Sequence, residues 1–239
     1  MNMTGTAGFA GSLARSRATP TSAGGSRVFA LAGREWDLLD GVFAPTHSAT
    51  TLVAMELLGL AGGGQDFRRR SSFLEIGSGT GVIAVSAALA GCDRVVATDI
   101  NPAAARNTAL NARRHGLAGR LTALQGDLFE PLGAHERFDT VYWHSNYVLA
   151  PAGYRYEADI ERAYVDPGYR AHRRYLSEAP GLVAPGGAAL LQFSERGDLG
   201  LLRRLADECG RTLRPLRRRR LREGAADIEL TLYEICVNR

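Results

Sequence analysis

The 239-residue chain is 45% hydrophobic and carries 29 basic and 25 acidic residues, for a formal net charge of +4, which is typical of one globular domain with a sizeable core and excludes a disordered polypeptide. No apolar stretch approaches the roughly 18 residues that cross a bilayer, and we see no signal peptide, so we expect no membrane partner and a cytoplasmic location. Every basic residue is arginine, which excludes chemistry that requires a lysine amine.

Neither the three cysteines nor the five histidines have a spacing typical of metal ligands, so we expect no metal. The arginine runs at 68–70 and 217–220 contain no interleaved aromatic residues, which favours a solvated surface over a nucleic-acid-binding one. We therefore do not expect a nucleic-acid partner. The composition leaves the oligomeric state open.

The N-terminal part of the chain changes character near residue 27. Residues 1–26 are rich in Gly, Ser, Thr and Ala, which predicts a flexible tail. Order is expected from about Val28. Thr46 has the properties of a helix cap, and apolar residues at 52, 55, 57 and 58 predict a helix that runs to about Leu60.

A glycine turn between a strand and a helix is the most informative feature of the sequence. The apolar residues 73–76 suit a buried parallel strand, and residues 82–90 suit a helix packed on the sheet. Between them, Gly77, Gly79 and Gly81 allow the backbone to bend sharply and a ligand to approach the main chain.

Acidic residues follow the next two predicted strands. Asp99 ends the strand 94–98, about 20 residues after the glycines, where a carboxylate accepts hydrogen bonds from ribose hydroxyls. Asn101 then caps a helix that has Pro102 in its first turn. A third strand, 121–124, leads to Asp127, which could accept a hydrogen bond from an adenine amino group. Together these residues predict a nucleoside site.

The second half of the chain supplies two more strands and a terminal hairpin. Residues 138–143 predict a fourth strand that ends at His144-Ser145-Asn146-Tyr147, at the ligand edge of the sheet. Five tyrosines lie between positions 154 and 175, where each either contacts a substrate or packs a helix on the sheet. A fifth strand, 188–193, ends at Ser194, and residues 213–217 and 228–237 predict a hairpin.

The stretch Glu75-Ile76-Gly77-Ser78-Gly79-Thr80-Gly81, with Asp99 and Asp127, resembles the class I S-adenosylmethionine (SAM)-dependent methyltransferases, over roughly residues 40–236. The resemblance implies an α/β, Rossmann-like fold: a seven-stranded, mostly parallel sheet with an antiparallel last strand and helices on both faces. It also implies SAM as the cofactor. The expected cofactor-binding residues are Thr51, Glu75, Gly77, Ser78, Gly79, Thr80, Gly81, Asp99, Ile100, Asn101, Asp127 and Leu128.

The segment before the core resembles that of the glutamine N5-methyltransferases, in which it folds over the cofactor. This implies a lid at 27–62, a catalytic domain at 63–239, and a position near the SAM methionine for Thr50 or Thr51. Trp36 or Phe43 would close the pocket. After the fourth strand those enzymes read Asn-Pro-Pro-Tyr, whereas His144 stands here in place of the Asn, so the usual nitrogen clamp is absent or rebuilt.

Because SAM is itself an activated electrophile, the protein mainly has to position an acceptor. We therefore expect a methyltransferase that acts on an N or O atom of a small molecule, in secondary metabolism. Asn146 and Tyr147 would orient the acceptor, and His144 would either remove a proton or bind the cofactor. The candidate catalytic residues are Asn146, Tyr147, His144, Tyr169, Ser194 and Trp36.

Two alternatives remain open. The Ser-Asn-Tyr after strand four, the tyrosine-rich insert and Phe193-Ser194 are similar to the azetidine-2-carboxylate synthases. Those enzymes cyclise SAM and release methylthioadenosine, with SAM as the sole substrate. The third reading is a non-catalytic SAM-binding or RNA-binding module, which the arginine runs favour weakly.

Overall fold

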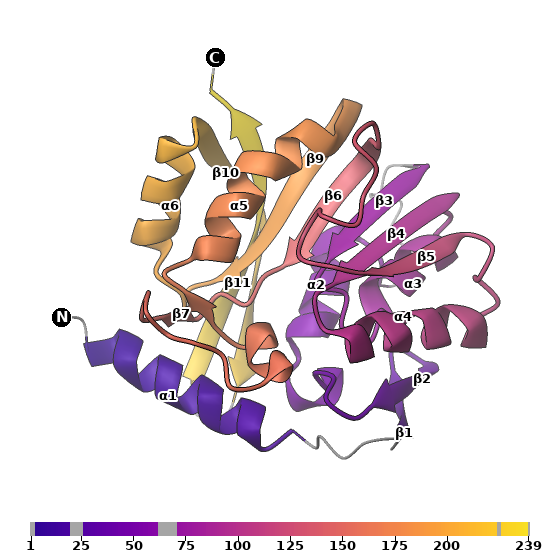
Figure 1. Cartoon of the computed structure of the whole chain (residues 1–239), viewed down its shortest axis with the longest axis horizontal. Coiled ribbons are helices and arrows are strands. Elements are labelled where there is room, and N and C mark those ends of the chain that lie inside the picture. The colour runs from indigo at the N-terminus through magenta and orange to yellow at the C-terminus, as the bar shows by residue number, and fades with distance from the viewer. Residues whose placement is uncertain (1–2, 20–25, 62–70, 224–225, 239) are drawn as a thin grey trace.

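The computed structural model describes residues 3–19, 26–61, 71–223 and 226–238, so the arginine run at 68–70 lies outside the described residues. Its centre is a seven-stranded sheet in the order β10-β11-β9-β6-β3-β4-β5 (Figure 1). The strands are β3 (Ser72–Ile76), β4 (Arg94–Asp99), β5 (Leu121–Gln125), β6 (Phe138–His144), β9 (Val183–Ser194), β10 (Arg211–Glu223) and β11 (Ala226–Val237). Neighbouring strands from β9 to β5 pair in parallel, whereas β11 pairs antiparallel with both β9 and β10. The predicted Rossmann-like fold is confirmed.

Helices cover both faces of this sheet. Alternate residues of each strand point to opposite faces, so Phe73 of β3 packs with α2 (Thr50–Leu58) and α3 (Val82–Leu89), together with part of α4 (Pro102–Arg114). Leu74 packs instead with α5 (Arg170–Glu178) and α6 (Leu199–Glu208). The strands thus have apolar residues on both sides, as expected for a parallel sheet buried between two helical layers. Among the described residues, no helix is long and apolar enough to cross a membrane.

Short elements complete the fold around the main sheet. They are the hairpin β1 (Ser26–Leu31) and β2 (Arg34–Leu39), the pair β7 (Leu149–Ala150) and β8 (Asp166–Pro167), and the 3-10 helices η1 (Pro45–His47), η2 (Asp159–Ala163) and η3 (Ala179–Leu182). The expected helix start at Thr46 is wrong. Pro45 begins a separate 3-10 turn, and α2 follows only at Thr50, where the N-cap is Ala49 and no side chain caps the helix.

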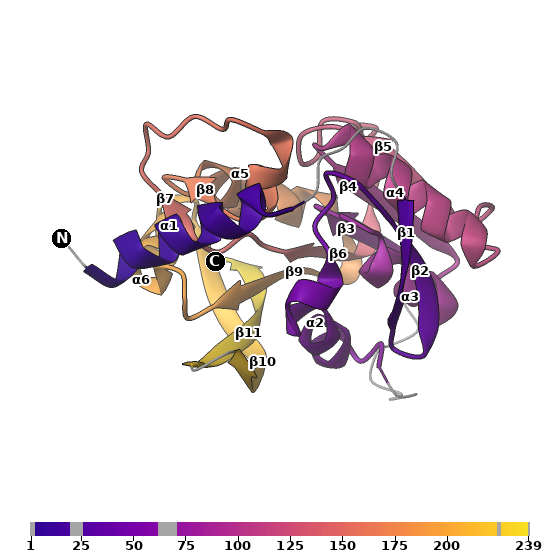
Figure 2. The ribbon, with the colours of Figure 1, turned by 90° about the horizontal axis from the view of Figure 1, so that it is seen from below.

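The N-terminal segment is a helix, where we expected a flexible tail. In α1 (Met3–Arg17), the side chain of Leu13 is buried against Ile160 and Tyr164. The Thr19 hydroxyl lies 3.2 Å from that of Tyr164. Figures 1 and 2 show α1 lying along the segment that contains β7 and η2. Because the helix has few large apolar side chains, its order depends on this tertiary contact, which composition does not reveal.

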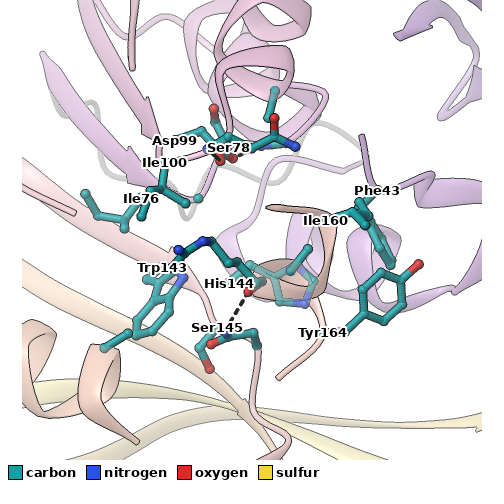
Figure 3. A pocket seen from close by; sticks show the side chains of 18 of the residues that line it. Phe43, Ile76, Ser78, Asp99, Ile100, Trp143, His144, Ser145, Ile160 and Tyr164 are labelled. Atoms are coloured by element: carbon teal, nitrogen blue, oxygen red, sulfur yellow. Dashed lines mark hydrogen bonds between the residues drawn. The ribbon is translucent and has the colours of Figure 1, made fainter. Parts of the chain in front are cut away.

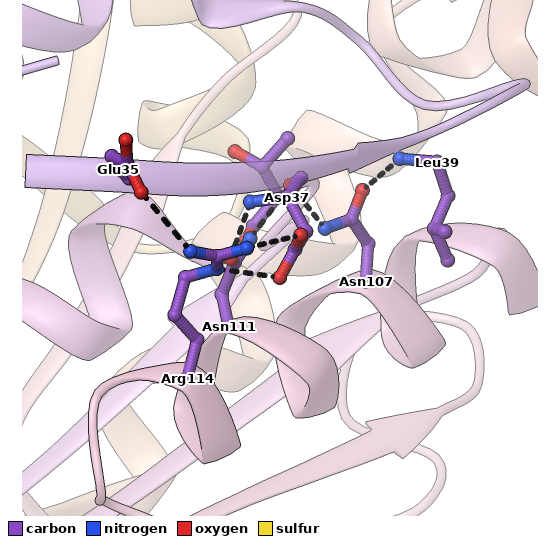
Figure 4. Close-up of polar contacts among 7 residues, drawn as sticks. Glu35, Asp37, Leu39, Asn107, Asn111 and Arg114 are labelled. Atoms are coloured by element: carbon purple, nitrogen blue, oxygen red, sulfur yellow. Dashed lines mark hydrogen bonds and ion pairs between the residues drawn. The ribbon is translucent and has the colours of Figure 1, made fainter. Parts of the chain in front are cut away.

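Strand β2 is held to α4 by buried amides (Figure 4). The Asn111 Oδ1 accepts a hydrogen bond from the Asp37 amide at 2.7 Å, and its Nδ2 donates to the carbonyls of Asp37 and Thr80, each at 2.9 Å. The Asn107 Oδ1 accepts a hydrogen bond from the Leu39 amide, and its Nδ2 donates one to the Asp37 carbonyl. The Arg114 guanidinium forms a two-bonded ion pair with the Asp37 carboxylate. The hairpin and the glycine turn are therefore attached to one face of α4.

We predict that Asn111→Ala lowers the free energy of unfolding by about 2–4 kcal/mol, because it removes three hydrogen bonds and leaves buried backbone groups without partners. The matched control is Arg113→Ala. Arg113 is exposed on the same helix, so its loss should change the free energy by less than about 0.5 kcal/mol. Urea denaturation monitored by tryptophan fluorescence measures both. Equal effects of the two substitutions would contradict this account of the β2–α4 contact.

Candidate functional site

A cavity of about 380 Å³ lies at the carboxyl ends of β3, β4 and β6 (Figure 3). In parallel α/β sheets, ligands bind at this edge, where the strand order reverses direction. Here the chain moves from β3 outward to β4 and β5, and then returns to β6 on the other side of β3. The cavity spans that switch point, and its volume suits a small organic cofactor.

The glycine turn forms the floor of the cavity. Gly77, Gly79 and Gly81 have φ of +65°, +56° and +80°, which side chains rarely allow. A Cβ on Gly81 would lie 2.9 Å from the Thr108 Cα, so only glycine lets α4 pack this closely. Thr108 donates a hydrogen bond from its hydroxyl to the Gly79 carbonyl at 3.1 Å. The turn therefore has a fixed shape and an exposed main chain.

Asp99 joins this turn to β4. Its Oδ2 accepts a hydrogen bond from the Gly79 amide at 2.8 Å, and its Oδ1 accepts one from the Asn101 amide at 2.9 Å. Burial raises the pKa of this carboxyl to about 6, although the two amides act against the shift. Each carboxylate oxygen keeps a second lone pair. The residue fits the role of acceptor for two ribose hydroxyls, and the cavity fits SAM.

Glu75 and Asp127 lie at the two sides of Asp99. The Glu75 Oε2 accepts a hydrogen bond from the Ala84 amide at 2.8 Å, in the first turn of α3, and burial raises the pKa of this carboxyl well above its ordinary value. Asp127 is partly exposed and forms an ion pair with the Arg174 guanidinium at 2.6 Å. One oxygen of Asp127 is therefore occupied by α5, which the sequence did not indicate.

Most of the predicted site residues meet at this cavity. Those that line it are Thr51, Glu75, Gly77, Ser78, Gly79, Thr80, Asp99, Ile100, Asn101, Asp127, Leu128, His144, Asn146 and Tyr147. Gly81 lies behind the floor as the N-cap of α3. Asn101 also caps α4, as predicted, because its Oδ1 accepts a hydrogen bond from the Ala103 amide at 2.9 Å.

Three of the expected catalytic residues do not line the cavity, and we correct their roles. Trp36 is fully buried, donates its indole N–H to the Leu31 carbonyl and packs on the His115 ring. Tyr169 is also fully buried. Its hydroxyl donates a hydrogen bond to the Tyr147 carbonyl and accepts one from the Asp198 amide. Ser194 is buried and accepts a hydrogen bond from the Arg196 amide. The contacts of Tyr169 and Ser194 hold Tyr147 and Arg196, which line the cavity. Trp36 belongs to the hydrophobic core.

His144 lines the cavity at the end of β6. Burial lowers the pKa of its imidazole to about 4, so the ring is neutral at pH 7. A base this weak is poorly matched to proton removal near neutral pH. The role of catalytic base is therefore not favoured, and the neutral ring is left as a polar group of the cavity wall.

Sequence reasoning missed the cover of the cavity. Ser12, Arg15 and Ala18 of the N-terminal segment line it, as do Ile160 and Tyr164. Of the two aromatic residues expected to close the pocket, Phe43 does so, and its ring lies 5.4 Å from that of Tyr164, centroid to centroid. In Figure 3 these two rings lie next to each other, on the side of the cavity opposite His144 and Asp99. The tyrosine-rich insert indicated part of this cover from the sequence, whereas the sequence of α1 did not indicate that it lies over the cavity.

We predict that Gly81→Ala lowers the midpoint of thermal unfolding much more than Gly116→Ala does. Both glycines have positive φ, +80° and +69°, so both substitutions impose backbone strain of about 1–2 kcal/mol. Only at Gly81 does the added Cβ also meet Thr108, because nothing lies within 4 Å of a Cβ on Gly116. Thermal unfolding followed by circular dichroism compares the two, and similar midpoints would contradict the tight contact between the turn and α4.

Comparisons with known proteins identify the same core. Residues 43–152 match the family model of the ribosomal protein L11 methyltransferase (PrmA). The chain is 33% identical to the release factor glutamine methyltransferase of Bordetella pertussis over 71% of its own length and 65% of the relative's. It is 35% identical to the ribosomal protein L11 methyltransferase of Pelotomaculum thermopropionicum over 61% of its length and 37% of the relative's. The chain thus spans less than two thirds of both relatives.

Among solved structures, the T. thermophilus 16S rRNA N2 G1207 methyltransferase in complex with AdoMet and guanosine is similar in fold. Its TM-score is 0.53 at 20% identity, over 90% of this chain and 50% of that one. AdoMet is SAM, so a protein of the same fold holds the cofactor that the sequence predicts.

These findings contradict two expectations. By their names, the relatives act on a release factor, a ribosomal protein and ribosomal RNA, which overturns the expected small-molecule acceptor in secondary metabolism and the expected lack of a nucleic-acid partner.

The glycine turn, the half-buried Asp99 and the cavity at the switch point agree with these comparisons. SAM is the cofactor of this fold and of these relatives. The chain belongs to the class I SAM-dependent methyltransferase superfamily.

Proposed function

We propose that this protein transfers a methyl group from SAM to a macromolecular acceptor, and that the acceptor is a protein. The observation that carries the proposal is the half-buried Asp99 carboxylate hydrogen-bonded to the Gly79 amide at the floor of the cavity. The acceptor class is supported by the names of the relatives, since the release factor and ribosomal protein enzymes are 33% and 35% identical to this chain.

Some residues of the cavity would hold the cofactor, and others would exclude water. Asp99 accepts hydrogen bonds from the ribose, and the glycine turn allows the cofactor to lie against the main chain. Phe43, Ile160 and Tyr164 form an apolar cover. When bound, SAM supplies an electrophilic methyl group. The protein then has to orient the acceptor, which agrees with the weak basicity of His144.

Cyclisation of SAM, the second reading of the sequence, is not supported by the comparisons. It predicts a different product from methyl transfer, because methylthioadenosine leaves instead of S-adenosylhomocysteine. Product analysis therefore separates the two reactions in a single assay.

The experiment is to incubate the purified protein with SAM alone and, in a separate reaction, with SAM together with a bacterial release factor or ribosomal protein L11. We expect S-adenosylhomocysteine and one added methyl group on the acceptor, located by peptide mass spectrometry. The control is Asp99→Asn, which should slow the reaction through weaker SAM binding. Methylthioadenosine from SAM alone, or methylation of small amines in preference to proteins, would overturn the proposal.

SAM binding should depend on pH through Asp99. Burial raises the pKa of this carboxyl from 3.8 to about 6, and only the ionised form leaves all its lone pairs free to accept. We therefore predict a constant SAM dissociation constant above about pH 7 that rises as the pH falls through 6. In Asp99→Asn the constant should be about 10–100-fold higher at pH 7.5 and independent of pH. Isothermal titration calorimetry measures both proteins, and an unchanged pH dependence in the variant would exclude Asp99 as its source.

The raised pKa of Asp99 affects folding stability in the opposite direction, because without ligand its contribution is largest at low pH. Because the folded state holds the Asp99 proton more tightly than the unfolded state does, this residue's contribution to stability falls as the pH rises from about 4 to 6. The free energy of unfolding, measured by denaturation without ligand at pH 4.5 and 6.5, checks this. We expect it to fall less between the two pH values in Asp99→Asn than in the wild type.

A further inference from the structure

One guanidinium group at the cavity comes from α1 and has no carboxylate partner in the described part of the chain. Arg15, Arg162 and Arg196 line the cavity. The Arg15 Nη2 donates a hydrogen bond to the Ser12 Oγ at 2.8 Å, and among the described residues Arg15 forms no ion pair. A guanidinium has five N–H donors, so Arg15 can still offer several to a ligand. Helix α1 precedes the residues 43–152 that match the family model.

The carboxylates of the cavity lie away from Arg15 or have an arginine partner. Glu75, Asp99 and Asp127 belong to β3 and to the segments at the ends of β4 and β5. Asp159 also lines the cavity, but its carboxylate lies 3.7 Å from the Arg162 guanidinium, which in turn covers the Tyr156 ring at 4.3 Å. The charge of Arg15 is therefore uncompensated by these groups, and it favours an anionic ligand.

Arg15 lies over the side of the cavity away from Asp99. Two residues before it, Leu13 packs on Ile160 and Tyr164. Figure 3 shows both of these side chains on the side of the cavity opposite Asp99. In SAM the ribose and the amino acid group are on either side of the sulfonium. A cofactor held at Asp99 by its ribose can therefore extend its amino acid group toward Arg15.

Helix α1 has little stability of its own. Three of its 15 residues are glycine, and each costs about 1 kcal/mol relative to alanine in a helix interior. The ion pair between Arg17 and Glu157 joins two exposed side chains, and such pairs contribute little. A ligand contact from α1 would therefore stabilise the helix in its position over the cavity.

We propose that Arg15 binds the carboxylate of the SAM amino acid group, and that this contact fixes α1 over the cavity. A carboxylate is costly to bury without a partner, and a guanidinium can bind it through two parallel N–H···O hydrogen bonds. The inference rests on SAM as the cofactor and is independent of the protein acceptor proposed above.

The test compares SAM with decarboxylated SAM, which lacks only the carboxylate, and needs no acceptor. Isothermal titration calorimetry measures both dissociation constants. We expect the wild-type protein to bind SAM about 10–100-fold more tightly than decarboxylated SAM. Arg15→Gln should remove most of this preference by weakening SAM binding, while the affinity for decarboxylated SAM does not fall.

The matched control is Arg17→Gln, which removes the same charge from the same helix. Arg17 pairs with Glu157 at 3.1 Å and does not line the cavity, so the preference for SAM should stay at the wild-type value. If Arg17→Gln reduces the preference as much as Arg15→Gln does, the general charge or the docking of α1 accounts for it, and the proposal is overturned.

Hydrogen exchange measured by mass spectrometry tests whether the contact fixes α1. In the wild-type protein, SAM should slow the exchange of the α1 amides more than decarboxylated SAM does, and Arg15→Gln should abolish this difference. Equal exchange with the two ligands in the wild-type protein would contradict the proposal.

The support beneath α1 has its own variant in the same measurement. The Asn146 Nδ2 donates hydrogen bonds to the carbonyls of Arg162 and Val165, at 2.7 and 2.9 Å, and Leu13 of α1 packs in the same cluster as Val165. Asn146→Ala loosens this segment, so it should speed the exchange of α1 in the ligand-free protein. Unchanged exchange would show that α1 does not depend on this support.

Two further outcomes would overturn the inference. Equal weakening of both ligands by Arg15→Gln would show that Arg15 contacts a group that they share, and equal affinities in the wild-type protein would show that no cation binds the carboxylate. Failure of the release factor and L11 assays with an intact preference for SAM would count against the proposed acceptor proteins and leave the Arg15 contact standing.

Discussion

The hydrogen bond from the Gly79 amide to the Asp99 carboxylate is the interaction on which the site depends. It joins the turn after β3 to the end of β4, and it fixes the position of both. Burying this carboxylate is unfavourable, as its raised pKa shows. Two backbone amides offset part of that cost and hold the carboxylate in one orientation beside the glycine turn.

Helix α4 supports this arrangement from behind. Thr108 contacts the glycine turn, and Asn111 bonds both the turn at Thr80 and strand β2 at Asp37. Because these side chains are fully buried, their hydrogen bonds are protected from water and costly to break. The floor of the cavity and the N-terminal hairpin are thereby tied to a single helix.

Features encoded by local sequence were predictable, and features that depend on distant contacts were not. The glycine turn and the Asn101 cap follow from residue type and spacing, and the mostly parallel seven-stranded sheet follows from the family resemblance; the structure confirms them. The roles of Trp36 and Tyr169 could not be read in this way, because an aromatic residue that packs a wall looks the same in sequence as one that lines a pocket. Helix α1 is the extreme case: its order comes from Leu13 packing on residues about 150 positions away.

The part of the cavity near Asn146 differs in construction from the part near Asp99. Asp99 is held by the sheet and its first turns, whereas Asn146 is held by carbonyls of the insert at 162–165. That insert is in turn covered by α1, through Leu13, Thr19 and Tyr164. A displacement of α1 would therefore be transmitted to the segment that positions Asn146, but not to the strands that position Asp99. Asp99 and Asn146 are thus held by separate parts of the molecule, and this separation is why substitutions at the two residues are expected to change different measurements.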